Sequence, residues 1–187
     1  KTSLARRLAQ RMEAELLLEN PEENPFLAQF YRDMPRYAFQ TQMFFLFQRV
    51  TQLRDLKQHE LFKPSIVADF MLEKDPLFAQ LTLNDDEFRL YQQVYRHLAP
   101  QAPTPDLVIY LQAPVDVLSA RVEWRGNKSE RRIGDDYLRK LAESYVEFFY
   151  RYDRSPLLIV NSENALDTKR HEQEVRGQRK TRHAELL

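Results

Sequence analysis

The sequence predicts an α/β protein in which helices cover a parallel sheet. Four short apolar runs have the length and composition of buried strands, and segments with a helical spacing of apolar residues lie between them. Strands that alternate with helices favour a parallel sheet covered on both faces. The 187 residues are 43% hydrophobic, which allows a sizeable core, and a chain of this length is typical of one domain.

The elements follow in order along the chain. The predicted strands cover residues 16–18, 65–68, 107–111 and 157–160. The predicted helices cover residues 1–12, 26–32, 36–56, 85–98, 115–124 and 135–152. The chain then turns polar and basic, so we expect one domain over residues 1–167 and an exposed helix or disordered tail over residues 168–187.

Composition restricts the compartment and the partners. Lys and Arg together number 28, as do Asp and Glu, so no positive field of the whole chain points to a long nucleic acid. Cysteine is absent, which excludes disulfides and thiolate metal sites, and no apolar run reaches the length of a membrane span. We expect a cytoplasmic protein with no membrane partner. Because the chain opens at Lys1 without an initiator Met, we also expect further residues upstream.

Lys1 and Thr2 open the first predicted helix and match the end of the phosphate-loop motif G-x-x-x-x-G-K-[ST]. In that motif, backbone amides at a helix N-terminus cradle phosphates, the Lys reaches the β- and γ-phosphates, and the hydroxyl binds Mg²⁺. The glycines of the motif are not in this chain. The same two residues therefore also suit an ordinary helix start with a capping hydroxyl.

Glu19 and Asp69 each follow a predicted strand on its carboxyl side. Open α/β sheets gather their ligand-binding groups at that edge, where a carboxylate can accept a proton or hold Mg²⁺. The alternative is that each carboxylate caps the turn or helix that follows it.

A basic stretch and an aromatic stretch are further candidates. Arg121 and Arg125 are four residues apart on one helix face, before a polar segment that contains Gly126. Such a segment suits a lid over phosphates, because phosphoryl transfer needs cations and the exclusion of water, and it also suits a solvated helix end. Gln42 lies among the aromatic residues of segment 26–47, where a few rings can stack on a base and an amide can pair with its edge, while most rings belong to the core.

Several segments, taken in order, resemble the deoxynucleoside kinases. They are Lys1-Thr2-Ser3, Glu19-Asn20-Pro21, Asn24-Pro25-Phe26-Leu27, Phe30-Tyr31, the helix around Gln42, Pro105-Asp106-Leu107-Val108-Ile109-Tyr110-Leu111, Arg125-Gly126 to Glu130, Tyr137-Leu138 and the helix of residues 145–149. The resemblance covers residues 1–160 and is closest to bacterial purine or broad-range members.

The resemblance implies a P-loop NTPase-type fold, with a parallel sheet flanked by helices and a helical lid, whose first strand and Gly-rich loop are missing from this chain. It implies transfer of the γ-phosphoryl group of ATP, with Mg²⁺, to the 5′-hydroxyl of a deoxynucleoside in nucleotide salvage, with a purine favoured. We also expect a homodimer. These expectations come from the family and not from periodicity.

At the phosphate end, the resemblance assigns a role to each matching residue. Lys1 would bind the phosphates and Thr2 would face Mg²⁺. Glu19 would be the general base that accepts the proton of the 5′-hydroxyl. Arg121 and Arg125 would be the lid arginines over the ATP phosphates.

At the nucleoside end, Tyr31 and Glu130 would hold the sugar 3′-hydroxyl, and Gln42 would pair with the base. After the second strand the family usually has an acidic residue followed by Arg and Ser, whereas this chain has Asp69-Phe70-Met71. Lys74 is the only basic residue near enough to replace that Arg, so Asp69 and Lys74 complete the expected substrate-binding set.

Two other functions stay open at this point. A thymidylate kinase-like enzyme shares the architecture, but its acceptor is a phosphate, so it does not need Glu19 as a base. A nucleotide-binding interaction subunit would keep the kinase fold without turnover. The missing Arg after Asp69 favours that second alternative, as do Asn127 and Lys128 in the lid, where another Arg is frequent in the family.

Overall fold

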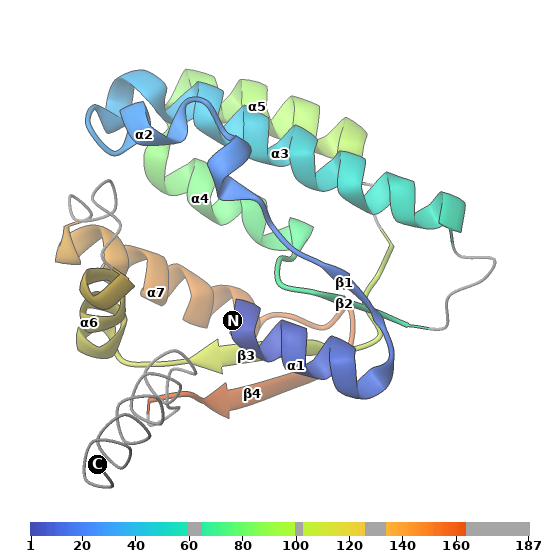
Figure 1. Cartoon of the computed structure of the whole chain (residues 1–187). Coiled ribbons are helices and arrows are strands. Elements are labelled where there is room, and N and C mark those ends of the chain that lie inside the picture. Colours follow the sequence, from blue (N-terminus) through green and yellow to red (C-terminus); the bar gives the residue numbers. More distant parts are fainter. Residues whose placement is uncertain (60–64, 100–102, 126–133, 164–187) are drawn as a thin grey trace, which may run out of the picture.

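The computed structural model describes residues 1–59, 65–99, 103–125 and 134–163, and Figure 1 shows their arrangement. The strands are β1 (Glu15–Leu17), β2 (Ile66–Ala68), β3 (Val108–Gln112) and β4 (Leu157–Asn161). The α-helices are α1 (Thr2–Met12), α2 (Leu27–Phe30), α3 (Met34–His59), α4 (Asp75–Thr82), α5 (Asp85–Leu98), α6 (Val115–Arg125) and α7 (Asp135–Tyr150). Two short 3-10 helices are η1 (Pro21–Glu23) and η2 (Leu72–Lys74).

The strands form two parallel pairs. β1 pairs with β2 in a register that places Glu15 opposite Ile66, and β3 pairs with β4 in a register that places Val108 opposite Leu157. The prediction of parallel strands is thereby confirmed. Within the described residues the two pairs form separate two-stranded sheets, whereas the sequence predicts one sheet. β1 and β2 have three residues each, so each strand offers few backbone groups to a further neighbour.

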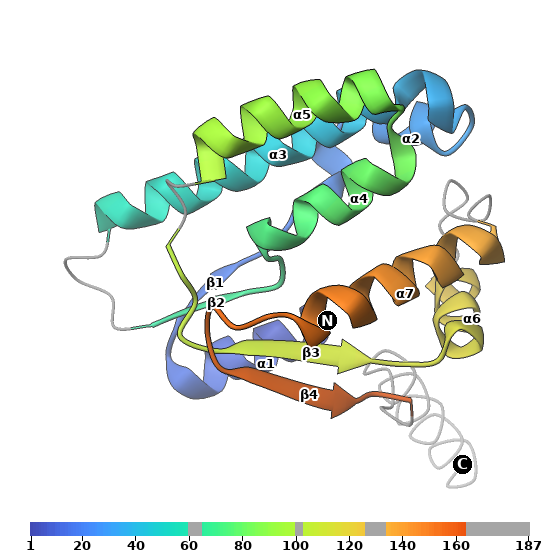
Figure 2. The same cartoon turned by 180° about the vertical axis from the view of Figure 1, so that it is seen from behind.

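The helices lie in layers beside the strands. Figures 1 and 2 both show α3 and α5 side by side at the top, α4 and α7 in the middle, and β3 with β4 below. Tyr110 of β3 stacks on Phe149 of α7 with their ring centroids 4.3 Å apart. α4 packs on both α3 and α7. α4 and α7 therefore connect the upper helices to the lower pair of strands.

The principal apolar core lies between α3, α4 and α5. Its buried members are Leu46, Val50, Leu72, Ala79 and Tyr91. Leu46 and Val50 are four residues apart, so they share the face of α3 that turns inward. Burying a side chain of this size stabilises the folded state by about 1.5–3 kcal/mol relative to leaving it exposed. This core fixes the position of α3, which supplies residues to the site described below.

One helix was not evident in the periodicity of the sequence. α4 begins at Asp75 with Pro76 in its first turn, where the missing N–H of proline costs no helical hydrogen bond. Its eight residues are too few to show a clear helical repeat. The other predicted helices are present with ends shifted by a few residues, as is usual for helix termini. The predicted lid segment after Arg125 and the tail of residues 168–187 lie outside the described residues.

Helix length and composition bear on membrane insertion. None of the helices in the described ranges combines the length and the apolar character that a bilayer-crossing segment needs. The longest of them, α3, includes the charged residues Arg36, Arg49, Arg54 and Asp55.

Candidate active site

The carboxyl ends of β1 and β2 bring Glu19 and Asp69 together. Asp69 directly follows β2, and its backbone N–H donates to the carbonyl of Leu17 at the end of β1. Its carboxylate Oδ1 in turn accepts from the backbone N–H of Glu19 at 2.9 Å. Parallel pairing places equivalent ends of both strands at one edge of the sheet. The two carboxylates expected at strand ends are therefore neighbours in space.

Lys1 and Thr2 reach the same point from the N-terminus of α1. The Thr2 hydroxyl donates to Asp69 Oδ2 at 2.5 Å. The Lys1 ammonium lies 3.3 Å from Glu19 Oε2 and donates to the carbonyl of Asp69 at 3.0 Å. Figure 1 marks this N-terminal end. Thus residues from three separate places in the sequence meet at the start of a helix whose dipole favours anions: the ammonium of Lys1 and the hydroxyl of Thr2, the carboxylate of Glu19 and that of Asp69.

Arg49 of α3 joins the cluster, although the sequence did not single it out. Its Nε and Nη2 both donate to Glu19 Oε1, with an Nε distance of 2.9 Å, and its Nη1 donates to Asp75 Oδ1 at the start of α4. The guanidinium also lies over the ring of Phe45, 5.0 Å from its centroid. The Arg49 side chain is only 9% exposed. One buried guanidinium therefore binds two carboxylates from different elements.

The pKa values of the two carboxyl groups that Arg49 binds are shifted in opposite directions, that of Glu19 downward and that of Asp75 upward. Burial alone would raise the pKa of Glu19, but the charges and hydrogen bonds of Arg49 and Lys1 lower it below its ordinary value. Burial raises the pKa of Asp75 to about 7, and the charge of Glu19 adds to this rise although Arg49 opposes it. At neutral pH Glu19 is therefore ionised, and Asp75 is close to the midpoint of its titration.

One carboxylate oxygen of Asp75 can still accept a hydrogen bond. Its Oδ2 is buried and accepts no hydrogen bond from any described residue, and the same is true of the hydroxyl of Tyr91. Tyr91 is 1% exposed, and burial followed by the nearby Asp75 charge raises the pKa of its phenol. Buried polar atoms without partners are rare in folded proteins. These two atoms mark a polar spot inside the helical layer.

Gln42 lies on the same face of α3 as Arg49, seven residues before it. It is 6% exposed, and its Nε2 donates to the Thr82 hydroxyl at 3.2 Å. The contact to α4 fixes the direction of the amide and leaves its oxygen as the acceptor. Its expected pairing with a base stays a prediction.

Lys74 precedes α4 and lies beside the cluster. Its ammonium is 5.0 Å from the centroid of the Tyr145 ring on α7. Burial and then the Arg49 charge lower the pKa of Lys74, while the charges of Glu19, Asp75 and Asp69 act against this. Lys74 is therefore within electrostatic range of the strand-end carboxylates, and its expected substrate-binding role stays a prediction.

The remaining expected residues make contacts other than those of the cluster or lie outside the described residues. Tyr31 is half-buried and packs edge to face on Phe30, with ring centroids 5.5 Å apart. Arg121 of α6 donates to the carbonyl of Ser162 at 2.5 Å, so it ties α6 to the end of β4. Arg125 is the last residue of α6, and its side chain, like the whole of Glu130, lies outside the described residues.

A sequence signal for Arg49 existed but is easily overlooked. Leu46, Arg49, Val50 and Leu53 recur at helical spacing, so Arg49 stands within the apolar stripe of α3. A charged residue on the buried face of a helix needs a partner, because burying an isolated charge is very unfavourable. No such pattern marked Asp75, which looks in sequence like an ordinary acidic residue in the first turn of a helix.

The residues present fit a Mg²⁺ ion bound together with a nucleotide. The described residues contain no group of three His, Cys, Asp or Glu side chains able to hold a metal by themselves. Mg²⁺ usually keeps several waters and takes one or two protein oxygens together with substrate phosphates, so a complete protein cage is not needed. The hydroxyl of Thr2, at the N-terminus of α1, is an oxygen of the required kind.

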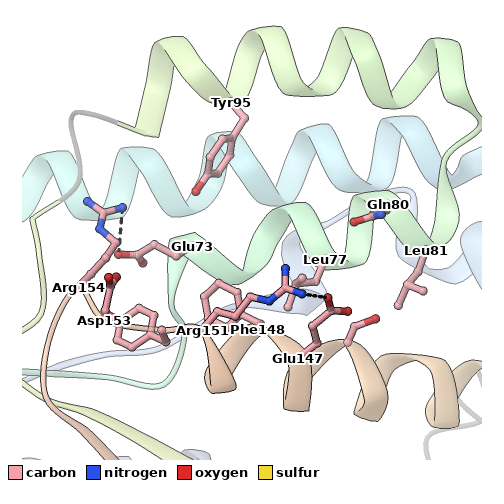
Figure 3. Close-up of a pocket in the computed structure, with 12 residues that line it drawn as sticks. Glu73, Leu77, Gln80, Leu81, Tyr95, Glu147, Phe148, Arg151, Asp153 and Arg154 are labelled. Atoms are coloured by element: carbon pink, nitrogen blue, oxygen red, sulfur yellow. Dashed lines mark ion pairs between the residues drawn. The ribbon is translucent and has the colours of Figure 1, made fainter.

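A separate groove lies between α4 and α7, away from this cluster. Its volume is about 730 Å³. Figure 3 shows two ion pairs at its walls, Arg154 with Glu73 and Arg151 with Glu147. Tyr95 of α5 also lines it, and burial raises the pKa of that phenol to about 12. None of the strand-end residues lines this groove, so it is distinct from the candidate active site.

Comparisons with known proteins identify a family for this chain. A family model for deoxynucleoside kinases matches residues 1–182. A deoxyguanosine kinase of Bacillus subtilis (strain 168) is 36% identical over 146 residues, which cover 78% of this chain and 70% of that protein. A deoxyadenosine kinase of Lactobacillus acidophilus is 27% identical over 177 residues, which cover 87% of this chain and 80% of that protein.

A solved structure is similar over nearly the whole chain. It shows deoxyadenosine kinase from M. mycoides with the products dCMP and a flexible dCDP bound. The TM-score is 0.76 at 26% identity, and the match covers 96% of this chain and 92% of that one. The family model, the sequence relatives and this fold lead to the same conclusion: the chain belongs to the deoxynucleoside kinase family and is a phosphotransferase with an alcohol acceptor.

Proposed function

We propose that this protein transfers the γ-phosphoryl group of ATP to the 5′-hydroxyl of a purine deoxynucleoside. The observation that carries the proposal is the convergence of Lys1, Thr2, Glu19 and Asp69 at the carboxyl ends of β1 and β2. This convergence supplies a cation for phosphates, a hydroxyl for Mg²⁺ and a carboxylate for proton transfer within hydrogen-bonding distance of one another.

Glu19 is the group that accepts the proton of the 5′-hydroxyl in this proposal. Arg49 and Lys1 keep its carboxylate ionised, so it is ready as an acceptor at neutral pH. A carboxylate of low pKa is a weak base, which suits phosphoryl transfer because its transition state is loose and the hydroxyl need not be fully deprotonated before attack. The hydrogen bonds from Arg49 also fix the direction of the carboxylate.

At the phosphate end, the reaction needs cations beside the phosphates and a lid that excludes water. In this proposal Lys1 binds the β- and γ-phosphates, and a Mg²⁺ ion held at Thr2 would neutralise charge that builds on the transferred group. Arg121 and Arg125, on α6, complete the proposed cation set from the lid side. The dipole of α1 adds to the attraction of phosphates at this point.

At the nucleoside end, the proposal assigns Gln42 to the edge of the base and Tyr31 with Glu130 to the sugar 3′-hydroxyl. Asp69 and Lys74 complete the substrate side. Support for a purine comes from two similar proteins, which are named as a deoxyguanosine kinase and a deoxyadenosine kinase. Since a side-chain amide can turn over to serve different bases, Gln42 orients the base more than it discriminates, and deoxyadenosine is our first choice of substrate.

Competition among the four deoxynucleosides tests the proposal. We expect the highest kcat/KM for a purine deoxynucleoside. The Gln42→Leu variant leaves the polar edge of the base unpaired, so its kcat/KM should fall by roughly 5- to 150-fold, equivalent to about 1–3 kcal/mol, with little change in the KM for ATP. Equal efficiency of parent and variant on every nucleoside would place the base pocket elsewhere, and a preference for a pyrimidine would refute the purine assignment.

A homodimer belongs to the same proposal. Sedimentation equilibrium of the active protein gives its mass in solution directly. Twice the mass of one protomer is expected, and the mass of a single protomer at working concentrations would contradict this part of the proposal.

A further inference from the structure

Polar side chains of α3 hold the segment that carries Glu19. This segment leads from the end of β1 to the start of α2 (Figure 1). Gln52 Nε2 donates to the carbonyl of Leu18 at 3.2 Å, and Gln48 Nε2 donates to the carbonyl of Asn20 at 3.2 Å. The carbonyl groups of the residues before and after Glu19 are therefore bonded to one helix.

The spacing of the two glutamines places them on one face of α3. Gln48 and Gln52 are four residues apart, so one lies above the other on the helix surface. A contact farther along extends the same arrangement, because Asn24 Nδ2 donates to the carbonyl of Thr41 at 3.2 Å, seven residues before Gln48. The segment thus runs along α3 in the direction opposite to the helix, from Gln52 toward Thr41.

The amide of Gln48 is fully used as a donor. Besides the Asn20 carbonyl it donates to Glu23 Oε2 at 2.8 Å, and Asn20 Nδ2 donates to the other oxygen of that carboxylate at 3.1 Å. An amide NH₂ group has two hydrogens, so these two acceptors satisfy it. The reverse orientation would place the amide oxygen against two acceptor oxygens, so the surroundings fix which way the amide points.

Side chains fix the backbone of Glu19, because the strand ends before it. β1 ends at Leu17, and its pairing with β2 ends there. The N–H of Glu19 donates to Asp69 Oδ1 at 2.9 Å. Gln52 and Gln48 hold the neighbouring carbonyl groups from the side of α3. Three hydrogen bonds to side chains therefore take over where the ladder of the sheet stops.

Glutamine is unfavourable at these two positions in one respect. The Oε1 atoms of Gln48 and Gln52 are buried and accept no hydrogen bond from any described residue. A buried acceptor without a partner destabilises the folded state. Methionine has a similar length and would not bury such an acceptor. The donated hydrogen bonds are therefore what glutamine contributes here.

We propose that Gln48 and Gln52 are positioning residues, which hold the backbone on both sides of Glu19 so that its carboxylate faces the 5′-hydroxyl of the deoxynucleoside. This role rests on the proposed function of Glu19 as the base. Proton transfer needs heavy atoms about 2.6–3.2 Å apart, so a shift of the segment by about 1 Å is enough to slow it.

Gln48→Glu and Gln48→Lys separate the donor from the size of the side chain. Glutamate has the shape of glutamine but presents oxygens to the Asn20 carbonyl and the Glu23 carboxylate, so kcat should fall about 10-fold or more. Lysine keeps donors for both acceptors, so kcat should stay within about 3-fold of the parent. The KM for ATP should not change in either variant. Equal kcat values for the two variants would refute the positioning role of Gln48.

Gln52→Met removes the donor at the other carbonyl, and Gln10→Met, at an exposed site on α1, is its control. Rapid-quench phosphoryl transfer at saturating substrates should be about 10-fold slower for Gln52→Met and unchanged for the control. In the Glu19→Gln background, Gln52→Met should slow transfer by less than about 2-fold, because the misplaced group is no longer a base. The same loss in both backgrounds would show a role independent of Glu19 and would overturn the proposal.

Amide hydrogen exchange followed by NMR needs no turnover. In the Gln48→Met/Gln52→Met double variant, the N–H of Glu19 should exchange about 10-fold faster or more, because the segment is released from α3. The N–H of Leu46, in the core on the same helix, should exchange as in the parent. An unchanged rate at Glu19, or an equal rise at Leu46, would show that the glutamines do not hold Glu19 in particular, and would overturn the proposal.

Failure of the positioning role and failure of the proposed function give different results. If the parent phosphorylates no deoxynucleoside, the proposed function fails, and hydrogen exchange still decides whether the glutamines hold Glu19. If the parent is active but the losses in the glutamine variants do not depend on Glu19, only the positioning role fails.

Discussion

The ionisation of Glu19 is determined by the residues that contact its carboxylate. The residue is a glutamate after a three-residue strand, and nothing in its own chemistry distinguishes it from other glutamates of the chain. Its character comes from Lys1 on one carboxylate oxygen and Arg49 on the other. These two cations make it a strongly ionised carboxylate at an edge of the sheet where substrates of α/β enzymes bind.

Removing the carboxylate charge tests that role. We expect Glu19→Gln to reduce turnover by about 100-fold or more at saturating substrate, as is usual when a general base is lost, while nucleoside binding survives. Glu22→Gln, an exposed glutamate in η1, is the matched control and should keep the parent rate. Rapid-quench measurement of phosphoryl transfer gives both rates, and near-parent turnover by Glu19→Gln would exclude Glu19 as the base.

Asp75 gives a pH-dependent stability that can be measured apart from activity. Burial raises its pKa from 3.8 to about 7, so its ionised form is disfavoured in the folded state. The stability that it contributes is complete below its ordinary pKa and is lost as the pH rises through its folded-state pKa. Relative to Asp75→Asn, which cannot ionise, the parent should lose free energy of unfolding with a slope approaching about 1.4 kcal/mol per pH unit within this window.

Urea unfolding of parent and Asp75→Asn at several pH values provides that comparison. The difference in unfolding free energy should change between mildly acidic and neutral pH. A difference that stays constant would show that Asp75 is ionised throughout, with the Arg49 ion pair outweighing burial.

At the scale of elements, the site depends on helices that are fixed independently of it. α5 begins with a capping box, in which the Asn84 side chain accepts from the N–H groups of Asp86 and Glu87 and the Glu87 carboxylate accepts from the Asn84 N–H. The helix then places Tyr91 in the core, next to Asp75. Local sequence thus determines where α5 starts and, through it, part of the surroundings of the site.

Asn84→Ala removes that cap and should destabilise the protein by about 1 kcal/mol. The cause is the loss of acceptors for two N–H groups of the first turn. Asn84→Asp keeps an acceptor in the same place and should remain within a few tenths of a kcal/mol of the parent. Urea unfolding of the three proteins measures the effect. Equal losses for both variants would mean that the amide nitrogen, and not the cap, is what matters.

Elements differ in how well the sequence predicts them, and the reasons are physical. The strands β3 and β4 are apolar runs between turn residues, so their prediction is off by one residue at most. α4 is short and begins at Asp75-Pro76, which looks like a turn when tertiary contacts are unknown. Glu19 and Asp69 could be predicted from strand ends, whereas Arg49 and Asp75 meet only because α3 packs on α4.

For the whole molecule, the order of strands and helices was enough to predict an α/β fold with parallel strands. The described residues confirm the parallel pairing and show two separate pairs. The family was predicted from the ordered set of short segments, and the family model that matches residues 1–182 confirms it. The base preference could not be predicted in the same way, since one amide such as Gln42 can pair with more than one base.

Family membership also decides between the functions that the sequence left open. A thymidylate kinase-like enzyme would transfer the phosphoryl group of ATP to a phosphate, and an interaction subunit would bind the nucleotide without turnover. The deoxynucleoside kinase family, in contrast, consists of phosphotransferases with an alcohol acceptor. The proposed reaction requires an alcohol acceptor, and Glu19 beside Lys1 is the group that would take its proton.

The most direct test of the central claim is the transfer of a labelled γ-phosphoryl group from ATP to defined acceptors. Deoxyadenosine and deoxyguanosine are each compared with their 5′-monophosphates, with Mg²⁺ present, for the parent and for Glu19→Gln. We expect label in the 5′-monophosphate formed from the nucleoside, none passed to the nucleotide acceptors, and about 100-fold slower labelling with Glu19→Gln. Label that passes only to a monophosphate acceptor, or ATP that binds without any transfer, would contradict the account.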